Sequence, residues 1–182
     1  MTTDPPEPKP RRKWHFYKWL VLLIVALARP QRVEDKREVR SQGYDIILSV
    51  DLSGSMLAED YEKNGEPINR LQAIKPVIQA FIDQRPSDRI GVVLFSGRAY
   101  TMAPLTFDHG WLSRQLTRVR IGMIEDGTAI GSAIASGVSH LRDSTAKSRI
   151  IILLTDGVNN AGAVNPLTAA EAAKALGIKV YT

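Results

Sequence analysis

The pattern of hydrophobic and polar positions alternates between two kinds of run after residue 43. Short apolar runs predict buried strands of a parallel sheet, at residues 44–50, 89–95, 148–155 and 178–182. Apolar residues at helical spacing predict amphipathic helices between them, at residues 71–85, 108–118, 129–141 and 166–176. Residues 99–102 predict a short edge strand that Pro104 ends. This alternation predicts a doubly wound α/β fold, with a mostly parallel sheet flanked by helices.

A separate apolar segment lies near the N-terminus. Residues 19–28 (WLVLLIVALA) carry no charge and follow a basic cluster at residues 11–13. A buried helix or a signal peptide is an alternative reading, but the ARPQ that follows is not a small-residue cleavage site. Counted from Trp14, with Lys18 extending to the polar boundary, the run is a short but usable membrane span. We therefore predict three segments before the domain: a disordered basic leader (1–13), a membrane-anchoring helix (14–29) and a linker (30–43).

The charge is unevenly distributed along the chain. Residues 1–43 hold ten Lys and Arg against five Asp and Glu, whereas the rest of the chain holds fourteen of each. The neutral domain lacks electrostatic support for binding nucleic acid. Basic residues beside an apolar span favour the cytoplasmic side. We therefore expect a single-pass membrane protein with its basic N-terminus in the cytoplasm and its domain on the extracytoplasmic side.

Five oxygen-bearing side chains occupy positions typical of a metal site. Asp51, Ser53 and Ser55 directly follow one predicted strand, Asp156 follows another, and Thr128 opens a predicted helix. The carboxyl ends of parallel strands share one edge of a sheet, where ligands bind. Carboxylates and hydroxyls suit Mg²⁺, with Mn²⁺ or Ca²⁺ also possible, and the absence of cysteine excludes thiolate sites. We expect a solvated rim, at which Asp51→Ala costs little stability.

Three segments resemble the metal-ion-dependent adhesion site (MIDAS) of von Willebrand factor type A (VWA) and integrin I domains. They are DLSGSM (51–56), GTAIG (127–131) and LLTDG (153–157). The resemblance implies a VWA, Rossmann-like fold in which three hydroxyls bind the cation directly, those of Ser53, Ser55 and Thr128. It implies that Asp51 and Asp156 act through bound water or as hydrogen-bond acceptors. The remaining position would take an acidic side chain of a partner protein.

Longer stretches are similar to the membrane-anchored bacterial Bat aerotolerance group (BatA- and BatB-like proteins). The stretches are ALARPQ (26–31), DIILSVDLSGSM (45–56), DRIGVVLFSGRAYTMAPLT (88–106), DGTAIGSAI (126–134), KSRIIILLTDGVNNAG (147–162) and GIKVYT (177–182). The resemblance implies a location in the bacterial inner (cytoplasmic) membrane, with the domain in the periplasm or otherwise extracytoplasmic. It also implies other VWA or Bat-type membrane proteins and a MoxR-type AAA+ ATPase as partners, in a complex linked to envelope stress and aerotolerance. It also implies a chain truncated at both ends, with a VWA domain (44–182) incomplete at its C-terminal end.

Two classes of function fit a metal at this edge. One is a protein-binding module that is not an enzyme and has no catalytic residues. The alternative is a metal-dependent hydrolase or phosphotransferase with Asp51 as phosphoryl acceptor. The sequence has no Walker A loop and no GxSxG motif, and Ser53 stands where a DxDxT motif has its second Asp. The histidines lack spaced partners and are interpreted as structural: His15, His109 and His140. These features favour the binding module.

Overall fold

The computed structural model describes residues 13–27 and 43–182, which belong to two separate compact units. In the first unit, α1 (Lys13–Leu27) is a helix of 15 residues that are exposed from Phe16 onward. No helix in the described part of the chain combines the length and apolar character needed to cross a membrane. The predicted leader and linker fall almost entirely outside the described residues.

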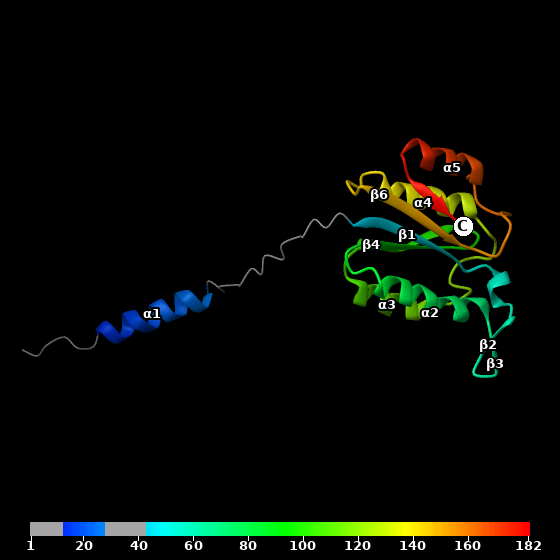
Figure 1. Cartoon of the computed structure of the whole chain (residues 1–182). Coiled ribbons are helices and arrows are strands. Elements are labelled where there is room, and N and C mark those ends of the chain that lie inside the picture. Colours follow the sequence, from blue (N-terminus) through cyan, green and yellow to red (C-terminus); the bar gives the residue numbers. More distant parts are fainter. Residues whose placement is uncertain (1–12, 28–42) are drawn as a thin grey trace, which may run out of the picture. The chain divides into compact units, whose positions relative to one another are not determined.

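The second unit is a sheet between two layers of helices (Figure 1). Its five strands lie in the order β5-β4-β1-β6-β7. Four of them are parallel, namely β1 (Tyr44–Asp51), β4 (Arg89–Phe95), β6 (Ser148–Leu154) and β7 (Lys179–Tyr181), whereas β5 (Ala99–Thr106) runs antiparallel to β4. The helices are α2 (Arg70–Asp83), α3 (His109–Arg118), α4 (Ile130–Leu141) and α5 (Pro166–Ala175). The predicted mostly parallel α/β class is confirmed.

Strand β1 is buried on both faces, which explains its nearly continuous apolar sequence. Ile46, Leu48 and Val50 pack into one cluster with the apolar faces of α2 and α3. Ile47 points the other way, into a second cluster with α4 and α5. Figure 1 shows these two helix pairs on opposite sides of the sheet. Two apolar layers thus hold the central strand, and the position of its last residue is fixed by the core.

The chain changes direction across the sheet at β1. This strand pairs with β4 on one side and β6 on the other, with Asp51 opposite Phe95 and Val50 opposite Leu154. The chain reaches β4 through α2 and reaches β6 through α4, on opposite faces. Ligands of open α/β sheets bind beyond the carboxyl ends of the strands at such a point. The loops that follow β1, β4 and β6 therefore surround the predicted site.

Two local predictions need correction. Strand β5 does not stop at Pro104 but continues to Thr106, because a strand paired on one side only tolerates proline. The hydrophobic pattern also missed an exposed hairpin formed by β2 (Tyr61–Lys63) and β3 (Glu66–Ile68). Its turn is Asn64-Gly65, with φ angles of 57° and 82°, and this dipeptide is a known signal for a two-residue hairpin turn.

Candidate metal centre

Asp51 organises the loop that leaves β1. It is the last residue of the strand and is 0% exposed. One carboxylate oxygen accepts the backbone N–H of Ser53 at 2.8 Å, and the other accepts the hydroxyl of Thr155 at 2.6 Å. Asp51 therefore turns its own loop and ties it to the loop after β6. The predicted solvated rim is wrong at this residue, because the core strand carries it below the surface.

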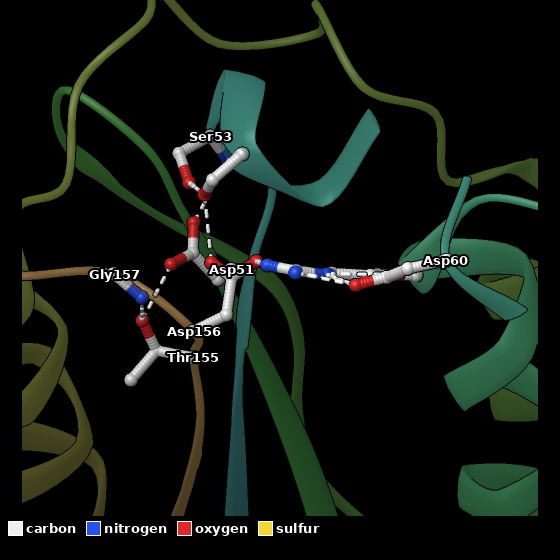
Figure 2. A network of polar contacts seen from close by, with 8 residues as sticks. Asp51, Ser53, Asp60, Thr155, Asp156 and Gly157 are labelled. Atoms are coloured by element: carbon white, nitrogen blue, oxygen red, sulfur yellow. Dashed lines mark hydrogen bonds and ion pairs between the residues drawn. The ribbon is translucent and has the colours of Figure 1, made fainter. Parts of the chain in front are cut away.

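The two serines of the loop converge, and Figure 2 shows the network that they join. The Oγ atoms of Ser53 and Ser55 lie 2.9 Å apart. Ser55 Oγ donates to Asp156 Oδ1 at 2.7 Å, so residues 101 positions apart meet. A short 3-10 turn, η1 (Gly54–Leu57), fixes this curvature, and buried Met56 holds the turn against the core. The structure thus brings Asp51, Ser53, Ser55 and Asp156 into one network.

Thr128 lies beside this network. Its hydroxyl oxygen is 3.3 Å from the position that a β-carbon would take on Gly157, the residue after Asp156. The backbone of Thr128 is held on both sides, because its N–H donates to Asn160 Oδ1 at 2.8 Å and its carbonyl accepts from Asn160 N at 3.1 Å. Asn160 therefore shapes the rim of the site by holding the backbone of Thr128.

Charged residues surround the network. Arg70, the first residue of α2, donates from Nη1 to Asp156 Oδ2 and from Nε and Nη2 to Asp60. Burial acts to raise the pKa of Asp156, but hydrogen bonds from Ser55 and Arg70 outweigh it and hold that pKa below its usual value. Asp126, in the loop before Thr128, accepts the N–H of Gly54 at 2.8 Å. These contacts connect the loop after β1 to the loop that carries Asp126, and the start of α2 to the loop that carries Asp156.

The donors present fit a hard divalent cation. The network offers hydroxyls and carboxylates and no sulfur, the set that suits Mg²⁺, Mn²⁺ or Ca²⁺. The described residues contain no group of three or more His, Asp or Glu side chains that could hold a metal. A cation here would therefore depend on the hydroxyls of Ser53, Ser55 and Thr128, together with the charge of Asp51 and Asp156.

Sequence reasoning missed three contributors to this edge: Arg70, Asp126 and Thr155. Thr155 directly precedes Asp156 and could have been found as a hydroxyl at a strand end. Arg70 and Asp126 lie in segments with no spacing pattern that relates them to the site. The two histidines of the domain lie elsewhere: His109 Nε2 is 3.0 Å from the carbonyl oxygen of Asp88, and His140 Nε2 is 2.8 Å from the Thr101 hydroxyl. Their contacts are structural in kind.

Comparison with known proteins identifies the family. Residues 46–159 match the von Willebrand factor type A domain. The chain belongs to this family. The VWA match runs from β1 to the loop after β6 and includes all five predicted site residues.

Solved structures extend the likeness of this VWA protein to the Bat group. An aerotolerance-related membrane protein from Bacteroides fragilis is 31% identical, with a TM-score of 0.68 over 76% of this chain and 65% of that one. BatB from Bacteroides thetaiotaomicron is 34% identical, with the same TM-score over 76% and 64%. Proximal thread matrix protein 1 from the mussel byssus, solved with zinc in its MIDAS motif, is 26% identical, with a TM-score of 0.59 over 76% and 37%.

A curated relative is considerably longer than this chain. An uncharacterized protein of Borreliella burgdorferi is 34% identical over 167 residues, which are 92% of this chain and 48% of that protein. The chain thus spans about half the length of this relative and just under two thirds of the two Bacteroides proteins. The resemblance to VWA and Bat-like proteins is confirmed, whereas activities of the longer proteins come to this chain only as proposals.

Proposed function

We propose that this VWA domain is a metal-dependent protein-binding module rather than an enzyme. The cation would be held by the hydroxyls of Ser53, Ser55 and Thr128 and balanced by Asp51 and Asp156. The observation that carries the proposal is the continuous chain of polar contacts from Asp51 through Ser53 and Ser55 to Asp156. Hydroxyl groups are weak ligands for a cation by themselves. Two carboxylates beside them would supply the negative charge that a divalent cation needs.

The bound cation would supply an open coordination position for an acidic side chain of a partner. The chain's own residues would hold the metal from the protein side, and Ser55, which lies at the exposed end of the network, would place it within reach of a partner. Mg²⁺ is the cation that we propose, with Mn²⁺ or Ca²⁺ as substitutes. The zinc-occupied MIDAS motif of the mussel protein supports a divalent ion at a site of this kind.

The position of Asp51 argues against the alternative of a hydrolase or phosphotransferase. A phosphoryl acceptor needs a carboxylate oxygen that a substrate can approach. Asp51 is 0% exposed, and both of its oxygens already accept hydrogen bonds from within the domain. Asp51 is thus suited to organising the loop and contributing charge.

We also propose a location and partners from the relatives. The Bacteroides fragilis neighbour is a membrane protein, and the apolar segment 14–29 would anchor this chain in the inner membrane with its domain outside the cytoplasm. Partners would include other VWA or Bat-type membrane proteins and a MoxR-type AAA+ ATPase, in a complex linked to envelope stress and aerotolerance. The description of the Bacteroides fragilis neighbour as an aerotolerance-related membrane protein supports the link to aerotolerance.

A pulldown from detergent-solubilised membranes tests the central claim. The full chain should retain a partner in Mg²⁺, lose it in EDTA, and recover it when Mg²⁺ or Mn²⁺ is restored. Ser55→Ala should abolish retention, because it removes one hydroxyl ligand from an exposed position. Ser139→Ala is the matched control, an exposed serine near the far end of α4. Retention that is equal with and without EDTA would overturn the proposal.

A further inference from the structure

The candidate metal site shares one of its carboxylates with an arginine. The two carboxylate oxygens of Asp156 have different partners. Oδ1 accepts a hydrogen bond from Ser55, and Oδ2 accepts one from Nη1 of Arg70. The rest of the Arg70 guanidinium is engaged by Asp60, to which Nε donates at 2.9 Å. Figure 2 shows Asp60 and Asp156 at the two ends of this ion chain. A permanent positive charge is therefore in direct contact with a residue that would balance a divalent cation.

The hairpin and α2 hold the arginine in this position. Asp60 immediately precedes β2, and Arg70 immediately follows the Asn69 that caps α2. The two residues therefore lie on either side of the β2–β3 hairpin, and their ion pair closes its base. Asn69 accepts the N–H of Gln72, whose side chain in turn accepts the N–H of Asn69, so the start of α2 is rigid. The Arg70 side chain is 32% exposed, so its charge lies at the partly solvated edge of the domain and not in the core.

We propose that Arg70 is a resident counter-cation that weakens the hold of the metal site on its divalent ion. The inference rests on the proposed function. An arginine stays protonated at every relevant pH. Its charge therefore repels the divalent ion and competes with it for Asp156. Asp60 has the opposite effect, because its negative charge partly neutralises the guanidinium. The site is thereby tuned to a lower affinity than its carboxylates alone would give.

A purely structural role for Arg70 makes a different prediction. If the ion chain only held Asp156 and the hairpin in place, breaking it at either end would disorder the site and weaken metal binding. If Arg70 acts through its charge, substitutions of Arg70 and of Asp60 change the metal affinity in opposite directions. Removing Arg70 removes a repulsive charge and strengthens binding, whereas removing the Asp60 charge leaves the guanidinium less neutralised and weakens it. Both roles predict weaker binding when the Asp60 charge is removed, so the direction of the change on removing Arg70 is what separates them.

Titration calorimetry of the full chain with Mn²⁺ is the experiment. We expect Arg70→Gln to bind Mn²⁺ about three- to tenfold more tightly than the wild type, the effect of removing one charge near a divalent ion in partly solvated surroundings. Arg70→Lys keeps the charge and should bind within about twofold of the wild type. Asp60→Asn should bind more weakly.

Arg142→Gln is the matched control for net charge. Arg142 follows α4 at the end opposite Thr128 and is exposed. The nearby Ser144 donates to Asp45, near the start of β1 and so at the opposite edge of the sheet from the site. Substitution of Arg142 should leave Mn²⁺ affinity unchanged, because the charge of Arg142 lies far from the site and is screened.

Three outcomes would overturn the inference. Unchanged or weaker Mn²⁺ binding by Arg70→Gln is the first, and a shift of Arg70→Gln and Asp60→Asn in the same direction is the second. A gain of equal size in Arg142→Gln is the third. Failure of the proposed function has a separate signature: the wild type would bind no Mn²⁺, or Ser55→Ala would bind it as well as the wild type. Thermal melts of each variant without metal confirm that the domain is folded.

Discussion

Two residues of the candidate site differ in how deeply they lie. Asp51 is fully buried at the end of the central strand, and its carboxylate satisfies the N–H of Ser53 and the hydroxyl of Thr155. Ser55 lies at the exposed end of the same network and donates to Asp156. Both are candidate contributors to cation binding, but only Asp51 also supports the fold, because a buried donor without a partner is costly.

Substitution of these two residues should therefore separate stability from metal binding. Asp51→Ala should lower the free energy of unfolding by about 1–3 kcal/mol, because the buried N–H of Ser53 and the hydroxyl proton of Thr155 lose their acceptor. Ser55→Ala should change it by no more than about 0.5 kcal/mol. Both should abolish Mn²⁺ binding. Urea unfolding without metal measures the first quantity and calorimetry the second. Equal destabilisation by both substitutions would show that the depth of Asp51 has no energetic consequence.

At the scale of elements, the start of α4 is packed unusually closely. This helix follows Thr128, and its second residue is Gly131. A β-carbon on Gly131 would lie 2.0 Å from the carbonyl oxygen of Val164, a backbone atom in the loop before α5. The backbone of α4 thus reaches the loop that carries Asn160, whose side chain fixes Thr128. Close packing of an element and placement of a site residue depend on the same glycine.

Gly131→Ala should therefore be destabilising by about 1–3 kcal/mol or more, since a backbone neighbour has to move. Gly110→Ala is the matched control, because Gly110 lies in α3 with its nearest potential contacts at 3.6 Å. There the higher helix propensity of alanine should stabilise by up to about 1 kcal/mol. Thermal unfolding of both variants measures the contrast. A neutral Gly131→Ala would mean that the loop before α5 moves aside freely.

At the scale of the whole molecule, charge and apolar character are divided between the two parts of the chain. The N-terminal 43 residues carry an excess of five positive charges, and in the remainder the positive and negative charges are equal in number. Helix α1 has exposed apolar side chains from Leu20 to Leu27, although no helix in the described residues is long and apolar enough to cross a membrane. The neutral VWA domain has no electrostatic attraction of its own to an anionic membrane surface. The membrane anchor proposed above would therefore lie in the N-terminal part.

This division predicts the orientation of the protein in cells. Basic residues 11–13 should keep the N-terminus in the cytoplasm and place residues 44–182 outside it. Protease added to intact spheroplasts should then digest the domain, while a cytoplasmic marker stays intact. Replacement of Arg11, Arg12 and Lys13 by alanine should weaken this preference. Complete protection of the domain until the cells are lysed would contradict the orientation.

The fold class, and the edge of the sheet at which chemistry could occur, follow from the amino-acid sequence alone. Run length and periodicity set the strands and helices, and the carboxyl ends of parallel strands must share one edge. Asp51 and Asp156 could therefore be placed together although 105 positions separate them. The adjacency of Ser53 and Ser55 to Asp51 is local, and a single turn of backbone is enough to make their hydroxyls converge.

The burial of Asp51 and the residues that surround the site depend on the tertiary packing and could not be predicted from local sequence patterns. Arg70 meets Asp156 across 86 positions, and Asp126 meets Gly54 across 72. These contacts join loops whose approach depends on how α2 and α4 pack against opposite faces of the sheet. No periodicity within one segment contains that information, because the energy that brings the loops together comes from burying apolar side chains elsewhere in the domain.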